Sequence, residues 1–286
     1  AKAYEALAQR YPADDEAKIF FALYNAGTQT QADQSYAAYL KSAGILETQF
    51  RKYPDHPGVA HYLIHSYDAP PLANQGLNAA RRYADIAPEA PHALHMPSHI
   101  FTRIGSWQES AATNVRSRDV AKAGGEVDEA YHASDYMVYA YLQLARDAAA
   151  RQAIYEALQV DAVTSRFAAR YAKAAMPARY AFERGAWPEA AKLQPLGSPY
   201  PFVEAITYFT RSVGAARSGD LALARKDAEQ LEALHNALLA AKNTYWATEV
   251  EVQRLAAAGW IALGEGKPEE GLKFMREAAD LEDRNE

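Results

Sequence analysis

The sequence has no cysteine among its 286 residues, and this absence removes several classes of functional site. Without thiols the chain has no disulfide framework, no thiolate nucleophile and no cysteine-bound zinc or iron–sulfur cluster. Long apolar runs are also missing, because stretches such as residues 20–23 and 256–263 are far shorter than the roughly 20 residues that span a bilayer. No dense run of Lys and Arg occurs, and 30 basic against 36 acidic residues give a net charge of −6. We therefore expect no membrane span and no nucleic-acid partner.

The beginning of the sequence gives little information about the compartment. The first residue is Ala1, and no signal-like apolar segment follows it. We expect an N-terminus that was removed by processing or truncation, so export to the periplasm and a cytoplasmic location both stay open.

The pattern of apolar residues is helical along the whole chain. Alanine is abundant, β-branched residues are sparse, and apolar positions recur every three or four residues, as in segments 221–239 and 249–263. Nothing resembles alternating strands joined by tight Asn-Gly turns. The sequence therefore predicts an all-α protein.

Internal repeats refine this prediction. The Pro-x-x-Pro segments at 54–57 and 88–91 are offset by 34 residues, which is the period of the tetratricopeptide repeat (TPR). The segment at 105–110 matches that at 185–190, and each contains a glycine that suits the left-handed turn at the end of a helix. We expect a right-handed α-α superhelix, a TPR-like solenoid of helical hairpins that forms one domain over residues 1–286. The Pro- and Gly-rich stretch near 194–201 is the candidate hinge.

Two segments also carry a family resemblance. They read HPGxxHYxIHxxD, from His56 to Asp68, and HMPSHIFxRxGxW, from His95 to Trp107. The chain resembles the TPR family in general and, through these segments, a bacterial group of TPR-like proteins. The resemblance covers about residues 50–140 closely, and it implies the helical-hairpin solenoid but no particular activity.

Histidine is the residue type that points to function, because seven of the eight histidines lie between positions 56 and 132. The 34-residue offset places His61 on His95 and His65 on His99. Each pair is spaced i, i+4, so both rings point to one side of a helix. Helices of adjacent repeats pack about 8–10 Å apart, so the two pairs can meet. We therefore expect a histidine cluster on the concave face of the solenoid.

An offset of 40, set by aligning a third predicted turn at Leu144-Ala145, extends this ladder to a third repeat. It places His132 on His92, Asp135 on His95 and Tyr139 on His99. We expect His132 to be a further ligand and Asp135 to support a ligating histidine.

Two other residues, Asp68 and Arg103, belong to the predicted surroundings of the cluster. Asp68 lies seven residues after His61 on the same stripe, and it competes with Asp135 for the supporting role. Arg103, four residues after His99, can hold an anionic ligand, although a salt-bridged or exposed position is the more ordinary one.

Imidazoles with a carboxylate favour zinc, copper, iron or nickel rather than calcium or magnesium. The predicted metal ligands are His61, His65, His95, His99 and His132, supported by Asp68, Asp135, His92, Arg103 and Tyr139. A zinc-protease motif is excluded because Tyr62, not Glu, follows His61. Neither a Gly-rich phosphate loop nor a nucleophile elbow occurs.

Two kinds of function remain open. One is a metal-dependent enzyme, hydrolytic or oxidative, in which the cluster holds a zinc, copper or iron ion. The alternative is a metal-free interaction module that binds a peptide, a protein or a small molecule in the concave groove, as repeat solenoids commonly do. In that case the histidines form a polar packing network.

Overall fold

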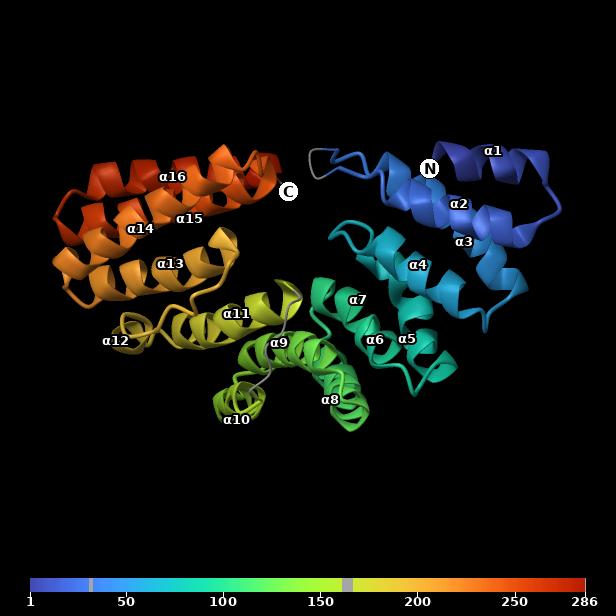
Figure 1. Ribbon diagram of the computed structural model, residues 1–286, viewed down its shortest axis with the longest axis horizontal. Coiled ribbons are helices and arrows are strands. Elements are labelled where there is room, and N and C mark those ends of the chain that lie inside the picture. The colour runs from blue at the N-terminus through green and yellow to red at the C-terminus, as the bar shows by residue number, and fades with distance from the viewer. Residues whose placement is uncertain (31–32, 161–166, 286) are drawn as a thin grey trace. The chain divides into compact units, whose positions relative to one another are not determined.

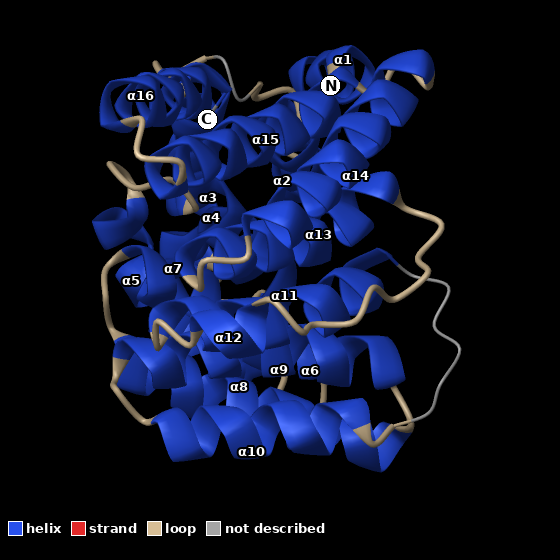
Figure 2. Cartoon of the chain, turned by 90° about the vertical axis from the view of Figure 1, so that its left-hand side faces the viewer, coloured by secondary structure: helices blue, strands red, loops and turns tan. Residues whose placement is uncertain are grey.

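The computed structural model describes residues 1–30, 33–160 and 167–285. Within these ranges 79% of the residues are helical and no strand occurs (Figure 2). None of the described helices is both long enough and apolar enough to cross a membrane. The all-α prediction is therefore confirmed.

Helix follows helix along the described residues, and most of the described connections are turns of a few residues (Figure 1). In chain order they are α1 (Lys2–Arg10), α2 (Asp15–Ala26), α3 (Ala37–Lys52), α4 (Pro57–Tyr67), the 3₁₀ helix η1 (Ala73–Gly76), α5 (Leu77–Ile86), α6 (Pro91–His95), α7 (Pro97–Arg103), α8 (Trp107–Gly124), α9 (Val127–Gln143), α10 (Asp147–Leu158), α11 (Phe167–Glu183), α12 (Trp187–Ala190), α13 (Pro201–Arg217), α14 (Leu221–Ala240), α15 (Thr244–Gly264) and α16 (Pro268–Asn285).

The chain divides into two compact units, Ala1–Ala149 and Ala150–Glu286. The candidate hinge at 194–201 is not this boundary, because it lies inside the second unit as the connection between α12 and α13. Two sets of contacts fix the position of that connection. The Glu204 carboxylate accepts a hydrogen bond from the Ser198 amide at 2.8 Å, and α13 packs against both α11 and α12. The interpretation of the chain as one continuous domain stays a prediction.

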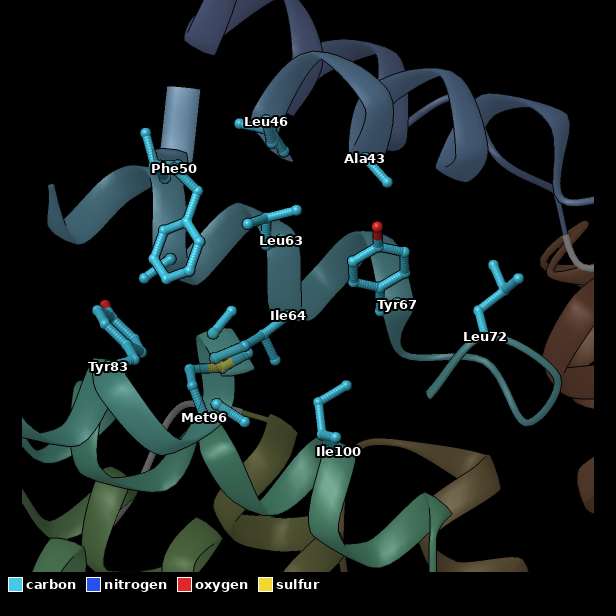
Figure 3. Packing of buried hydrophobic residues seen from close by; sticks show 14 of the residues in the cluster. Ala43, Leu46, Phe50, Leu63, Ile64, Tyr67, Leu72, Tyr83, Met96 and Ile100 are labelled. Atoms are coloured by element: carbon cyan, nitrogen blue, oxygen red, sulfur yellow. The ribbon is translucent and has the colours of Figure 1, made fainter. Parts of the chain in front are cut away.

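The first unit is a stack of helical hairpins. Each of α1 to α4 packs against the next helix, α5 packs against α4 and α7, and α8 packs against α6, α7 and α9. The core between these layers contains Leu46, Leu63, Ile64, Met96 and Ile100, all of them fully buried (Figure 3). One face of α4 therefore belongs to the core, and its other positions are left to carry the histidines.

The turns use the left-handed backbone conformation that the glycine pattern predicts. Gly105 has φ +74° and Gly185 has φ +60°, and each precedes a helix that begins at a tryptophan, Trp107 or Trp187. The third related turn has Ala145 at φ +53° instead. A side chain makes this conformation costly, so packing must hold the turn in place there.

The second unit uses the same principle of packing consecutive helices. Helices α13, α14, α15 and α16 pack in sequence, with a core that contains Val203, Leu231 and Val250. The guanidinium of Arg217 lies 4.1 Å from the ring centroids of both Trp187 and Trp260 and so joins α12, α13 and α15.

Candidate metal centre

Six of the histidines lie together in the first unit, in two groups of three. The first triad is His61, His65 and His92, and the second triad is His95, His99 and His132. Within each triad the three candidate ligand nitrogens lie within 4.8 Å of one another. The structure thus divides the predicted four-histidine group between two triads, each completed by one further histidine.

The first triad joins α4 to α6. His61 and His65 are one turn apart on α4, and their Nε2 atoms are 3.0 Å apart. The ring of His92, at the start of α6, lies edge-on to that of His61 with centroids 5.1 Å apart. His92 is exposed, with 47% of its side chain accessible to solvent, so this triad is open to solvent on one side.

The second triad is built where Pro97 divides one helical segment into α6 and α7. Met96 keeps helical dihedral angles, φ −52° and ψ −37°, so the chain continues with nearly the same twist. The i, i+4 pair therefore survives the proline, and the Nε2 atoms of His95 and His99 are 3.1 Å apart. His132 comes from α9, with its ring centroid 4.2 Å from that of His95.

Hydrogen bonds on the far side of two rings fix their tautomers. The Asn114 side-chain amide donates to the Ser110 carbonyl at 2.8 Å, so its oxygen faces His95 Nδ1, 2.7 Å away. That nitrogen must therefore carry the proton. His99 Nδ1 likewise donates to the Asp68 carboxylate at 2.8 Å.

Asp68 is ionised in this arrangement. Burial disfavours the charge, but the hydrogen bonds and charges of His99 and Arg103 outweigh burial and hold the pKa of the carboxyl well below its usual range. Arg103 donates from Nε to the other carboxylate oxygen at 2.9 Å. Asp68 therefore orients His99, and Arg103 orients Asp68, as partners of metal-bound histidines commonly do.

The Nε2 atoms of His95 and His99 face each other in the second triad. With each ring bonded to its acceptor through Nδ1, both Nε2 atoms can present lone pairs, and they are 3.1 Å apart. This contact is favourable only when a cation, either a proton or a metal ion, lies between or beside the nitrogens. The geometry is that of two ligand atoms directed at one electrophile.

Four of the six histidines are also held neutral. Burial, together with the charges that neighbouring histidines would carry, lowers the pKa of His61 to about 3. Burial likewise lowers the pKa values of His65 and His132 to about 4 and places that of His95 well below its usual value. Neutral imidazole is the form that binds metal ions, so protons compete weakly for these ligands at neutral pH.

The remaining residues of the predicted site, Asp135, Tyr139 and Arg103, differ in their neighbours. Asp135 is buried on α9, one turn after His132, and its role in supporting a ligating histidine stays a prediction. At His95 the supporting side chain is that of Asn114. Tyr139 packs edge-on against Trp107, with ring centroids 5.4 Å apart. Arg103 is salt-bridged to Asp68, which is the more ordinary of the two roles considered for it.

Sequence reasoning missed Tyr136, whose ring lies 4.7 Å from that of His95 and 5.2 Å from that of His99. The signal was present: an offset of 37 from the second pair places His132 on His95 and Tyr136 on His99. The three pairs then share one i, i+4 spacing. The offset of 40 was set by the turn at Leu144, and it shifted the third repeat by three residues. No repeat offset of this kind pointed to Asn114, which lies on α8.

The depressed pKa values generate a prediction about stability. Between about pH 6.5 and pH 4 an unfolded chain protonates these histidines, whereas the folded metal-free protein does not. Protons therefore favour unfolding, and the melting temperature of the chelator-treated protein should fall as pH falls through this window. The loss contributed by Asp68 comes only below about pH 4, where unfolded carboxyl groups protonate.

Thermal melts at half-unit pH steps check this prediction. His132→Gln should make the pH dependence shallower, whereas His235→Gln, in the second unit, should leave it as in the wild type. A melting temperature that stays constant from pH 6.5 to pH 4 would contradict the assignment of these histidines as buried and neutral.

Comparison with known proteins extends only to the fold. No protein-family model and no curated protein matches the chain. Among solved structures it is similar to a tetratricopeptide repeat protein from Parabacteroides merdae, with a TM-score of 0.59 and 15% identity over 98% of this chain and 94% of that one. At this identity the likeness concerns architecture alone, so the chain has the TPR-like all-α fold that its repeats predict.

Proposed function

We propose that this protein binds transition-metal ions through its histidines, with one ion in each triad. The observation that carries the proposal is that three imidazole nitrogens lie within 4.8 Å of one another in each triad. In the second triad the Nε2 atoms of His95 and His99 also face each other at 3.1 Å, and each ring is held in that orientation by an acceptor at its Nδ1.

The donor set limits the kind of metal. All six candidate ligands are imidazoles, with no thiolate in the chain and the Asp68 carboxylate placed behind His99. Imidazole suits zinc, copper, iron and nickel, whereas calcium and magnesium require oxygen ligands. Zinc, copper and iron are therefore the proposed ions.

Three protein ligands leave a coordination position open on each ion. Structural zinc sites are usually closed by four protein ligands, whereas catalytic ions keep one position for water or substrate. Three imidazoles per ion, with His92 exposed, support a metal-dependent enzyme that activates water or dioxygen. A metal-free interaction module would have the same fold, but it does not explain why three imidazole nitrogens converge in each triad.

The first prediction concerns metal content. Protein purified without a polyhistidine tag should carry close to two transition-metal ions per chain by elemental analysis. His92→Ala and His132→Ala should each reduce the content to about one ion, because each removes the ligand that joins a triad to another helix. A chelator should lower the melting temperature of the wild type, since ions that bind only the folded state stabilise it.

His235→Ala is the matched control for this experiment. His235 lies in the second unit, beside Glu251, so its loss should leave both the metal content and the sensitivity to chelator unchanged. The proposal would be contradicted if the wild-type protein contained no metal and its melting temperature changed neither with EDTA nor with added zinc or copper.

The second prediction concerns Asp68. Asp68→Asn keeps the size of the side chain but removes the charge that stabilises His99 as a ligand, so metal affinity at the second triad should fall by roughly 10–100-fold. Titration of the metal-free protein with Zn²⁺ measures the change. Glu109→Gln, at an exposed ion pair with Arg81, is the control for loss of one negative charge and should bind zinc as the wild type does. Wild-type affinity in Asp68→Asn would show that the carboxylate does not support the ligand.

A further inference from the structure

The two triads are direct neighbours, although their rings are slightly farther apart across the triads than within them. Ring centroids within the triads are 4.8 Å apart for His61 and His65 and 5.0 Å apart for His95 and His99. Across the triads, His65 and His99 are 6.2 Å apart, and so are His92 and His95. Two metal ions held by such rings are close neighbours rather than independent sites.

The six candidate ligands bring no negative charge to offset that of two dications. Two carboxylates lie behind ligand rings, Asp68 behind His99 and Glu129 at 3.6 Å from His92 Nδ1. The charge of Asp68 is already shared with Arg103. Two divalent ions would therefore repel each other strongly in a partly buried site, and an anion between them would remove much of that repulsion.

The open coordination positions provide a place for that anion. Each ion has three protein ligands, so each can accept at least one more. Water is present at molar concentration, and coordination to a dication lowers its pKa to about 7. A water between the ions can therefore give one proton to bulk solvent and remain as hydroxide, with its oxygen bonded to both ions.

We propose that the two triads form one dinuclear centre in which a hydroxide derived from solvent bridges the two ions. This inference rests on the proposed metal binding and adds the chemical identity of the exogenous ligand. A hydroxide held in this way is a nucleophile, and it suits metal-assisted hydrolysis of a small electrophilic substrate that enters through the open side at His92.

Copper(II) is the probe that tests the bridge. The metal-free protein is loaded with two equivalents of Cu²⁺ at neutral pH, bound copper is counted by elemental analysis, and unpaired spins are counted by electron paramagnetic resonance. A single oxygen between two copper(II) ions couples their spins, so most of the signal expected for the bound copper should be lost. His92→Ala and His132→Ala should each bind one copper and recover the full signal per ion, while His235→Ala should match the wild type.

The outcomes separate this inference from the proposal of metal binding. Two bound coppers with full spin intensity would overturn the bridge and leave metal binding intact. One bound copper per wild-type chain would overturn the dinuclear centre and leave a single site. No bound copper, together with no bound zinc, would overturn both.

Discussion

The Nε2 atoms of His95 and His99, which face each other at 3.1 Å, are the constraint on which this account of the site depends. Hydrogen bonds at the Nδ1 atoms of the two rings, to Asn114 and to Asp68, hold the nitrogens in this orientation. Those partners lie on α8 and at the end of α4, so three layers of the first unit must be packed before the pair exists. The fold thus positions a polar arrangement that would be unfavourable without a cation.

The same layers explain why the site is both buried and accessible. Ile64 and Met96 are completely buried and fill the space between α4 and α6, which directs the histidines of these helices to the other side. His95 is only 1% exposed, whereas 47% of the His92 side chain is accessible. Burial lowers the pKa values of the imidazoles at the buried end, and the exposed His92 gives the other end access to solvent.

The sequence was sufficient for the fold class and for most of the histidine cluster. Helical periodicity and the 34-residue offset are local signals. They predicted the hairpins, and they placed His61 and His95, and likewise His65 and His99, at equivalent positions of adjacent repeats. The division into two triads could not be predicted, because it depends on the angle between α4 and α6. Asn114 was also out of reach, since its contact with His95 exists only through the packing of α8 on α6. Pro and Gly also marked the loop at 194–201, but they do not indicate where one compact unit ends and the next begins.

Anomalous X-ray diffraction from crystals of untagged protein, recorded at the absorption edge of the metal found by elemental analysis, tests the central claim most directly. The account predicts two separate peaks in each chain. One should be coordinated by His61, His65 and His92 and the other by His95, His99 and His132, with metal–nitrogen distances of about 2.0–2.1 Å if the ions are zinc. A single peak shared among His61, His65, His95 and His99, or no peak at the histidines, would contradict it.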